Sequence, residues 1–171
     1  VNEFDVFLDD IYDYCETLDI GVDTLVHESG PSQIEINLNH GDPLRLADQT
    51  FMFKRAVRQV ALKHGIHATF MAKPHQGQPG SSMHIHQNLL SIKSGKNIFS
   101  DELGKESEAF YQYIGGLQTY LPDAMVFFAP YVNSYRRFVI DASAPINTHW
   151  GFDNRTVGLR VPLSSPESKR V

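Results

Sequence analysis

Cysteine is almost absent from this sequence, because Cys15 is the only one among its 171 residues. A single cysteine excludes an intramolecular disulfide, and such sparse use of cysteine is typical of a reducing compartment. We therefore expect a cytoplasmic protein. No motif that activates a thiol accompanies Cys15, so we interpret it as a packing residue.

Long apolar runs and a basic excess are missing as well. No apolar stretch approaches the length that spans a membrane, and no signal peptide opens the chain. Fifteen basic and twenty acidic side chains give a net charge of −5, whereas a general nucleic-acid binder carries a basic excess. We expect a protein that binds neither membranes nor nucleic acid. With 42% apolar residues, the chain suffices for one domain with a sizeable core.

The spacing of the apolar residues predicts both helices and strands. Helical spacing covers residues 1–18, 43–64 and 106–128, and a break is expected at Pro122 in the last of these. Asp42 and Pro43 are typical of a helix start, and Gly65 is typical of a helix end. Strand patterns cover residues 21–28, 33–39, 70–74, 83–90 and 156–161, with turns predicted at 30–32 and 94–97. Since the strands are joined both by turns and by helices, we expect an α+β domain with a mainly antiparallel sheet flanked by helices.

Two histidines lie beside a polar loop in the stretch from Phe70 to Leu90. The loop, residues 75–82, is rich in glycine, proline and polar residues. His84 and His86 are two residues apart on the strand predicted after it, so both imidazoles point to the same face. This arrangement is typical of a functional site. The alternative is a pair of hydrogen-bonded histidines on an ordinary sheet.

Two glutamates, Glu28 and Glu35, flank the first predicted turn. In a hairpin they approach each other, and two carboxylates repel unless a positive group lies between them. A divalent cation such as Mg²⁺ or Mn²⁺ suits hard oxygen ligands, and histidine joins glutamate in many such sites. The alternative is two solvated glutamates on an exposed sheet face.

The C-terminal third carries a local basic surplus within an acidic chain. Arginine binds phosphate and carboxylate groups through a two-pronged fork, so this surplus predicts an anionic ligand. The alternative is surface ion pairing, which contributes little to stability. Arg155 and Arg160 are an odd number of residues apart, so on one regular strand they face opposite sides. The basic residues are Arg136, Arg137, Arg155, Arg160, Lys169 and Arg170.

A divalent metal, histidines, a polar loop and arginines together indicate metal-dependent phosphoryl or acyl-phosphate chemistry. The sequence lacks a Walker-type glycine loop with lysine and serine, and it lacks the glycine loop of protein kinases. The familiar nucleotide-binding folds are therefore not indicated.

Several segments, in order along nearly the whole chain, resemble the catalytic domain of the glutamine synthetase family. That fold is similar to the catalytic domain of guanidino kinases. The segment from Glu28 to Glu35 and the helix that contains residues 46–48 also match. The matching segments are ATFMAKP at 68–74, GSSMHIHQNL at 80–89, NSYRR at 133–137, APIN at 144–147 and WGFDNRTVGLRVP at 150–162.

The resemblance implies an ATP-dependent ligase that phosphorylates the γ-carboxylate of glutamate and lets ammonia or an amine attack the acyl phosphate. Two or more Mg²⁺ or Mn²⁺ ions per site are implied as cofactors. The resemblance gives each matching residue a role. The implied metal ligands are Glu28, Glu35 and His84. The implied ATP-binding residues are His86, Arg155 and Arg170. The implied glutamate-binding residues are Gly80, Arg137 and Arg160, and Arg137, Arg155 and Arg160 are the implied catalytic residues.

Two departures from the family pattern bear on the nucleophile and on the glutamate loop. The family loop reads Asn-Gly-Ser-Gly-Met-His, whereas residues 79–84 read PGSSMH, which removes the asparagine. A glutamine synthetase places a glutamate just before the Ala-Pro at 144–145, where this chain has Ser143. A neutral hydroxyl does not supply the charge that helps to bind ammonium, although Asp141 lies two residues earlier. In this respect the chain is similar to the branch that makes γ-glutamylputrescine and other γ-glutamyl polyamines.

The chain lacks segments that the family uses to complete its site. An upstream Glu-x-Glu strand, a metal-binding glutamate just after the position of Val171 and the small N-terminal domain are missing. We interpret residues 1–171 as a partial catalytic domain, inactive alone, from a homo-oligomeric ring, expected to be a dodecamer of two stacked hexamers. The alternatives are a true glutamine synthetase that uses ammonia, a non-catalytic relative, and a kinase of related fold.

Overall fold

The computed structural model describes residues 4–139 and 144–171, which form an α+β fold. The chain divides into two compact units, one up to Gly80 and one from Ser81 onward. Each unit contains one sheet of two strands, antiparallel in the first and parallel in the second. The antiparallel pairing predicted for the hairpin is thus confirmed, and the parallel pair is a departure from the prediction. Within the described ranges, no helix is long and apolar enough to cross a membrane.

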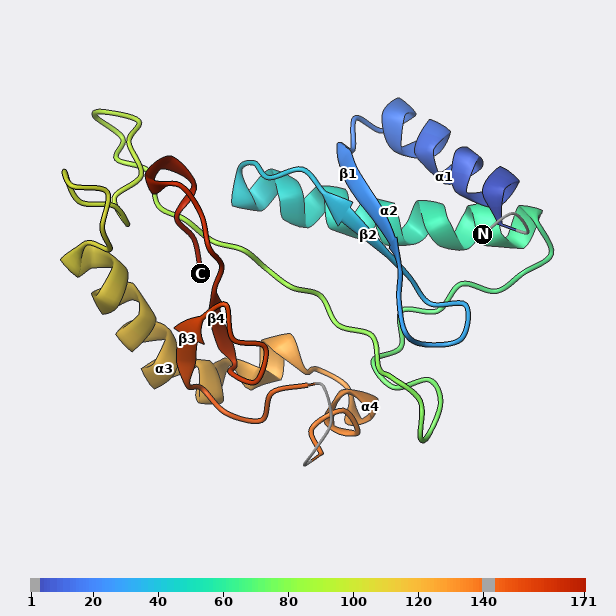
Figure 1. The fold of residues 1–171 in the computed structure, drawn as a ribbon. Coiled ribbons are helices and arrows are strands. Elements are labelled where there is room, and N and C mark those ends of the chain that lie inside the picture. The colour runs from blue at the N-terminus through green and yellow to red at the C-terminus, as the bar shows by residue number, and fades with distance from the viewer. Residues whose placement is uncertain (1–3, 140–143) are drawn as a thin grey trace. The chain divides into compact units, whose positions relative to one another are not determined.

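The first unit is a helix, a hairpin and a second helix, as predicted (Figure 1). The second helix begins as its sequence predicts, because the Asp42 side chain accepts hydrogen bonds from the backbone N–H groups of Leu44 and Arg45. It ends before Gly65, which has a φ of +68°. The elements are α1 (Asp5–Thr17), β1 (Val22–His27), β2 (Ile34–Leu38) and α2 (Pro43–Lys63).

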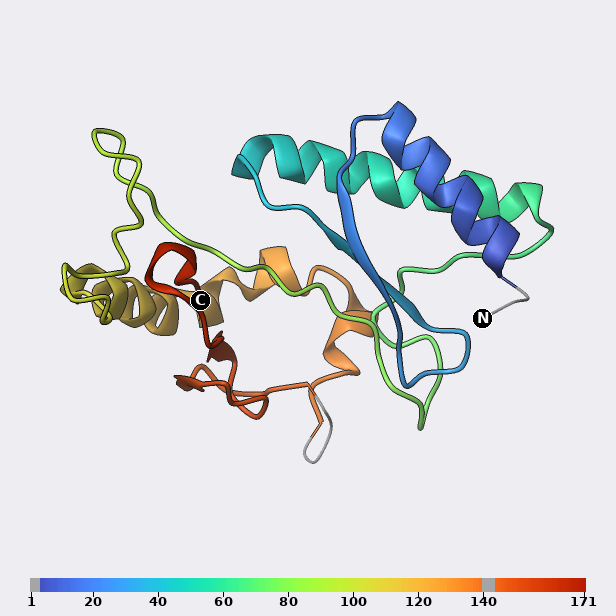
Figure 2. The ribbon, with the colours of Figure 1, turned by 45° about the horizontal axis from the view of Figure 1, so that its top comes forward.

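The core of the first unit lies between the hairpin and the two helices (Figure 2). Ile36 and Leu38 of β2 pack against it from the hairpin. Cys15 is 1% exposed and belongs to this core, which confirms its interpretation as a packing residue. Burial also raises the pKa of its thiol, which keeps the sulfur protonated and unreactive. The buried members are Ile11, Cys15, Ile20, Phe53, Val57 and Val60.

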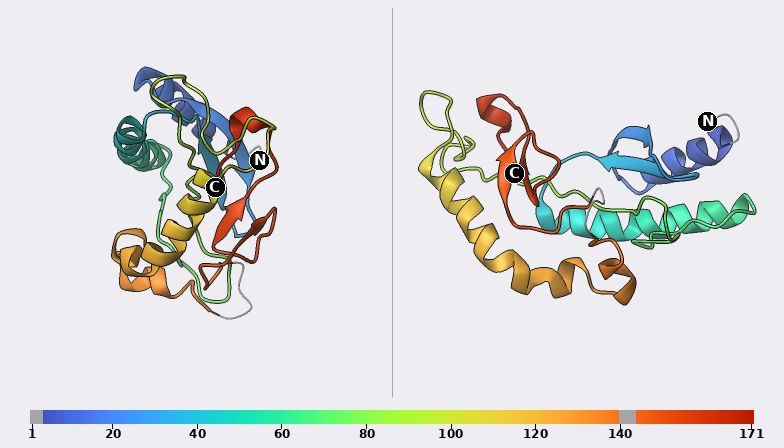
Figure 3. Two further views of the ribbon diagram at one scale, coloured as in Figure 1. Left: turned by 90° about the vertical axis from the view of Figure 1, so that its left-hand side faces the viewer. Right: turned by 60° about the horizontal axis from the view of Figure 1, so that its bottom comes forward.

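The second unit is built on one long helix and the parallel strand pair. Its helix runs unbroken through Pro122 (right-hand view of Figure 3), so the predicted break is wrong. Proline removes one backbone donor from the helix, but the later turns keep theirs, and Ala129 N–H still donates to the Met125 carbonyl at 2.7 Å. The elements are α3 (Glu108–Phe128), α4 (Val132–Tyr135), β3 (Trp150–Phe152), β4 (Leu159–Val161) and a 3₁₀ turn, η1 (Pro166–Ser168).

Aromatic rings form much of the core of the second unit. The Phe99 and Phe110 rings meet edge to face with centroids 5.6 Å apart, and Phe110 meets Trp150 at 6.4 Å. Leu159 and Val161 contribute from β4, so every second residue of this strand points into the core. The buried members are Phe99, Phe110, Ile114, Leu159, Val161 and Val171.

The strands predicted at 70–74 and 83–90 are absent, and this correction affects both histidines. A strand requires a ladder of hydrogen bonds to a neighbour, and the second segment has only isolated pairings. Gln87 exchanges two backbone hydrogen bonds with Val171, at 2.8 and 3.0 Å, and Leu90 bridges to Asn97. The Leu90–Asn97 bridge closes the turn predicted at 94–97. His84 and His86 therefore lie on an irregular segment rather than on one face of a sheet.

Candidate functional site

The hairpin of the first unit presents both predicted metal-binding glutamates on one face. Glu35 pairs with Val26 in the register, and the backbone N–H of Glu28 donates to the Gln33 carbonyl at 2.9 Å. Since Ile36 of β2 faces the core, the alternation of a strand directs Glu35 to the opposite, open face. Glu28 extends this face at the diagonal position. The hairpin therefore brings the two carboxylates to one side, as the sequence predicts.

The two glutamates fit a hard divalent cation. Glu35 Oε1 accepts a hydrogen bond of 3.1 Å from Asn37 Nδ2, which orients the carboxylate. Within the described ranges, neither Glu28 nor Glu35 forms an ion pair with a lysine or arginine. Two same-face carboxylates without a cationic partner suit Mg²⁺ or Mn²⁺. In the part of the chain that the structure describes, no three histidine, cysteine or acidic side chains gather as a complete ligand set.

Gln33 ties the predicted glutamate loop to this hairpin. Its Nε2 donates to the Gly80 carbonyl at 3.0 Å, and its Oε1 accepts from the Gly30 N–H at 3.1 Å. A Cβ on Gly30 would lie 2.5 Å from Gln33 Oε1, so only glycine leaves room for this contact. Gly80 is thereby held beside the turn between Glu28 and Glu35. Sequence reasoning missed Gln33, although its position two residues before Glu35 places it on the same face.

In the second unit, four of the predicted site residues lie near one another around His86. Arg170, His84 and Arg160 all lie close enough to affect the charge of its imidazole. Partial desolvation lowers the pKa of His86 first, and these neighbouring charges lower it further. His86 therefore favours the neutral form more than a free imidazole does, and it lies near the guanidinium groups of Arg160 and Arg170. The backbone pairing of Gln87 with Val171 brings the two segments together.

Arg160 occupies the middle of β4, on the face opposite to the core. Its Nη2 donates to Asp153 Oδ1 at 2.9 Å, and its Nε is buried without a partner among the described residues. Sequence reasoning missed Asp153. The sequence did offer a signal for a role of Asp153, because it directly precedes Asn154 and Arg155 in the motif at 150–162 that matches the family.

Arg155 and Arg137 lie outside these contacts. Arg155 is exposed in the turn between β3 and β4. The strand predicted from Thr156 begins only at Leu159, so the prediction is wrong for its first three residues. Arg155 and Arg160 therefore do not share a strand, and the expectation that they face opposite sides of one strand does not apply. The turn forms because the Asn154 side chain accepts from the backbone N–H of Thr156 at 2.9 Å. Arg137 is half-buried after α4, and this burial lowers its pKa. Asp141 and Ser143 lie outside the described residues.

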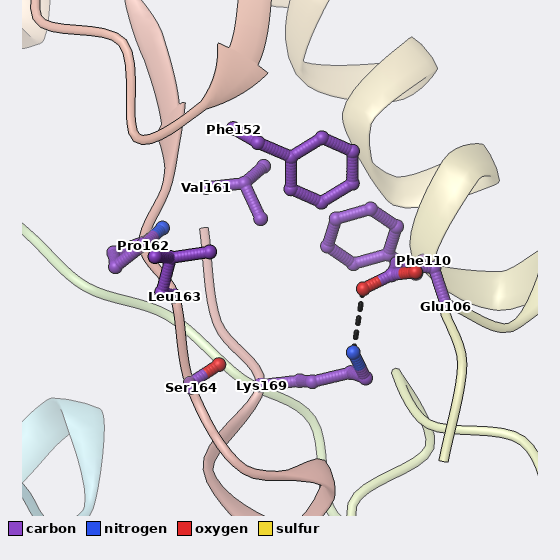
Figure 4. Close-up of a pocket in the computed structure, with 8 residues that line it drawn as sticks. All are labelled: Glu106, Phe110, Phe152, Val161, Pro162, Leu163, Ser164 and Lys169. Carbon is purple, nitrogen blue, oxygen red and sulfur yellow. Dashed lines mark hydrogen bonds and ion pairs between the residues drawn. The ribbon is translucent and has the colours of Figure 1, made fainter. Parts of the chain in front are cut away.

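A cavity of about 140 Å³ lies in the second unit, and its lining includes none of the predicted site residues (Figure 4). Lys169 Nζ and Glu106 Oε1 form an ion pair of 2.5 Å at its edge, with side chains 11% and 23% exposed. Asn97 fixes the same C-terminal segment by donating to the Lys169 carbonyl at 2.8 Å. We interpret this region as structural, because both charges neutralise each other. The lining residues are Glu106, Phe110, Phe152, Val161, Pro162, Leu163, Ser164 and Lys169.

We expect Glu106→Gln to lower the thermal unfolding midpoint of the intact protein above about pH 5, and to lower it progressively less as the pH falls below the unfolded-state pKa of Glu106. The hydrogen bond from Lys169 lowers the pKa of Glu106 below its usual 4.5. Its stabilising contribution is therefore present above the unfolded-state pKa and is lost as the pH falls through the lower folded-state pKa. Melting curves of both proteins across this range provide the test, with the exposed Glu102→Gln as control. A difference that persists unchanged in acid contradicts the expectation.

Comparison with known protein families identifies a match along the whole chain. Residues 1–171 match the family described as "Glutamine synthetase, catalytic domain". The chain is 41% identical over 172 residues to Gamma-glutamylputrescine synthetase PuuA of Escherichia coli (strain K12), covering 100% of this chain and 36% of that protein. It is 40% identical over 162 residues to Glutamine synthetase of Pyrococcus horikoshii, covering 95% and 36%.

Two further comparisons extend this result. The chain is 38% identical over 146 residues to Glutamate--isopropylamine ligase of Pseudomonas sp, covering 84% of this chain and 32% of that protein. A solved structure described as "Apo GmaS without ligand" matches with a TM-score of 0.81 and 33% identity, over 99% of this chain and 38% of that one. This match supports the α+β fold. The chain spans about a third of the length of the relatives that it matches.

Proposed function

Since the chain belongs to the glutamine synthetase family, we propose that it is part of the catalytic domain of an ATP-dependent ligase that joins an amine to the γ-carboxyl of glutamate. The observation that carries the proposal is the backbone pairing of Gln87 with Val171 in the second unit, which brings the segments of His84, His86 and Arg170 together. These residues match family positions that handle phosphate and metal. Guanidinium groups gathered near a histidine are suited to an anionic, phosphorylated reactant.

The proposed reaction has two steps. A γ-carboxylate oxygen of glutamate attacks the γ-phosphorus of ATP, and ADP leaves. The amine nitrogen then attacks the carbonyl carbon of the acyl phosphate and loses a proton to solvent, and inorganic phosphate leaves as the amide forms. Both steps concentrate negative charge on phosphoryl oxygens, so their rates depend on fixed positive groups at those atoms.

We assign each proposed site residue of this chain to the metal, to ATP or to glutamate. Glu28, Glu35 and His84 are the proposed metal ligands, and Mg²⁺ or Mn²⁺, when bound, shields the charge of the phosphoryl oxygens. His86, Arg155 and Arg170 are assigned to ATP. Arg137 is half-buried and partly desolvated, and its guanidinium keeps its charge. A charged group screened less by water attracts a substrate carboxylate more strongly. Arg137, Arg160 and Gly80 are assigned to glutamate, and Arg137, Arg155 and Arg160 are the proposed catalytic residues.

Within this function we propose an organic amine, rather than ammonia, as the nucleophile. Ser143 supports this preference, because a neutral hydroxyl does not attract ammonium as a glutamate does. Two of the similar proteins are named for putrescine and isopropylamine, whereas another is named a glutamine synthetase. Ammonia is therefore the alternative nucleophile. The cytoplasmic location and the ring of two stacked hexamers stay predictions.

The intact protein, with the segments beyond these 171 residues, provides the test. We expect ATP, glutamate and Mg²⁺ to release phosphate when putrescine, spermidine or a small monoamine is added, and to release little with ammonium. The best release with ammonium would identify a glutamine synthetase and overturn the preference for an amine. No release with any nucleophile would favour a non-catalytic relative. A stable phosphorylated acceptor in place of an amide would indicate a kinase.

A further inference from the structure

An ion pair between Asp153 and Arg160 lies at the surface of the second unit. Asp153 Oδ1 and Arg160 Nη2 are 2.9 Å apart, and the two side chains are 55% and 38% exposed. Arg160 lies on β4, while Asp153 directly follows β3, the strand beside it. A surface ion pair of this kind adds little to stability, so a stabilising role explains it poorly.

The backbone holds Asp153 in place independently of any ligand. Its φ is +42°, a left-handed conformation that aspartate and asparagine tolerate better than most residues. Its N–H donates to the Val161 carbonyl at 2.9 Å, which fixes the turn against β4. Gly151, the register partner of Arg160, makes room for this turn, because a Cβ there would lie 3.3 Å from Asn154 Cβ. The turn therefore directs the carboxylate of Asp153 toward Arg160.

The guanidinium of Arg160 has donors that the ion pair does not use. Asp153 takes one hydrogen of Nη2, and Nε is buried without a partner in the part of the chain that the structure describes. Native proteins rarely leave a buried donor unpaired, and a ligand oxygen is one explanation for such a group. Because the guanidinium is planar, fixing Nη2 also fixes the direction in which Nε points.

We propose that Asp153 is a positioning residue, whose carboxylate holds the Arg160 guanidinium so that Nε and the remaining donors face a carboxylate of the glutamate substrate. The inference rests on the proposed function, which gives Arg160 its substrate. A long arginine side chain loses rotamer freedom when it binds, and a partner that has already oriented it reduces this loss. Asp153 itself touches no substrate in this arrangement.

Asp153→Asn in the intact protein tests the inference. Asparagine keeps the size of the side chain and tolerates a positive φ, so the substitution removes charge without straining the backbone. We expect the KM for glutamate to rise about tenfold, as for loss of a charged hydrogen-bond partner. We expect the KM for ATP to change less than about twofold, because Asp153 acts only on a glutamate-binding residue.

The chain offers a closely matched control. Asp19 also has a positive φ, +56°, and also pairs with an arginine, Arg45, at an exposed place in the first unit. Asp19→Asn makes the same chemical change at a residue that has no proposed role in the site, and we expect it to leave both KM values unchanged. Asp153→Gly is the second variant, because glycine accepts the positive φ and removes the carboxylate altogether. We expect it to raise the glutamate KM as Asp153→Asn does.

Two readouts separate positioning from a general structural role. We expect the unfolding midpoint of Asp153→Asn to stay within about 2 °C of the parent protein. In an Arg160→Gln background, we expect Asp153→Asn to weaken glutamate binding by less than about twofold, because its effect passes through Arg160. Calorimetric titration with glutamate measures this binding in both backgrounds without requiring turnover. An equal effect in both backgrounds, or an unchanged glutamate KM in an active Asp153→Asn enzyme, overturns this inference alone. A parent protein that turns over no amine with glutamate and ATP overturns the proposed function, and this inference with it.

Discussion

Replacing Glu35 with glutamine in the intact protein is expected to lower the rate of amide formation about a hundredfold, the scale of losing one group that stabilises transition-state charge. Glutamine keeps an acceptor oxygen for Asn37, so the local hydrogen bond survives. It removes one of two negative charges on the open face of the hairpin, and a divalent cation then binds more weakly. The measurement is phosphate release as a function of Mg²⁺ concentration, and the concentration for half-maximal rate is expected to rise.

The thermal stability of the protein without Mg²⁺ tests the same two glutamates in a second way. Loss of one carboxylate relieves repulsion with Glu28, so Glu35→Gln is expected to leave the unfolding midpoint unchanged or to raise it slightly without Mg²⁺. Asp23→Asn, at an exposed position of β1, is the control and is expected to leave the Mg²⁺ dependence unchanged. An active Glu35→Gln enzyme with the parent Mg²⁺ dependence would show that the glutamates are solvated residues of an ordinary sheet.

Replacing Phe110 with alanine is expected to destabilise the second unit by about 3–5 kcal/mol. The Phe110 side chain is 0% exposed, its ring contacts those of Phe99 and Trp150, and it lines the 140 Å³ cavity. Its loss enlarges a space that already exists, so the surrounding side chains cannot close it without moving the strands. Because Arg160 lies on β4 and Asp153 directly follows β3, glutamate binding is expected to weaken as well. Urea unfolding of the intact protein measures the change.

Phe127→Ala provides the matched control for this substitution. Phe127 lies on the same helix, α3, and is 79% exposed. The same chemical change at this position is expected to alter stability by no more than about 0.5 kcal/mol. Equal effects at the two positions would show that Phe110 is not a central residue of the core.

The sequence by itself determined the elements whose signals are local. Asp42, Pro43 and Gly65 mark the ends of α2, because capping and a positive φ depend only on neighbouring residues. The hairpin and the common face of Glu28 and Glu35 follow from the two-residue period of a strand and a short turn. The ordered motifs also identified the family along the whole chain.

Only the tertiary structure decided the contacts between segments that lie far apart in the chain. An alternating pattern predicted a strand through His84 and His86, but the described residues supply no ladder for it, and pairing with Val171 brings His86 near Arg170 instead. The link from Gln33 to Gly80 has no local signal either. The physical reason is that a hydrogen bond between distant residues depends on how the whole chain packs, whereas a cap or a turn is specified by the few residues that form it.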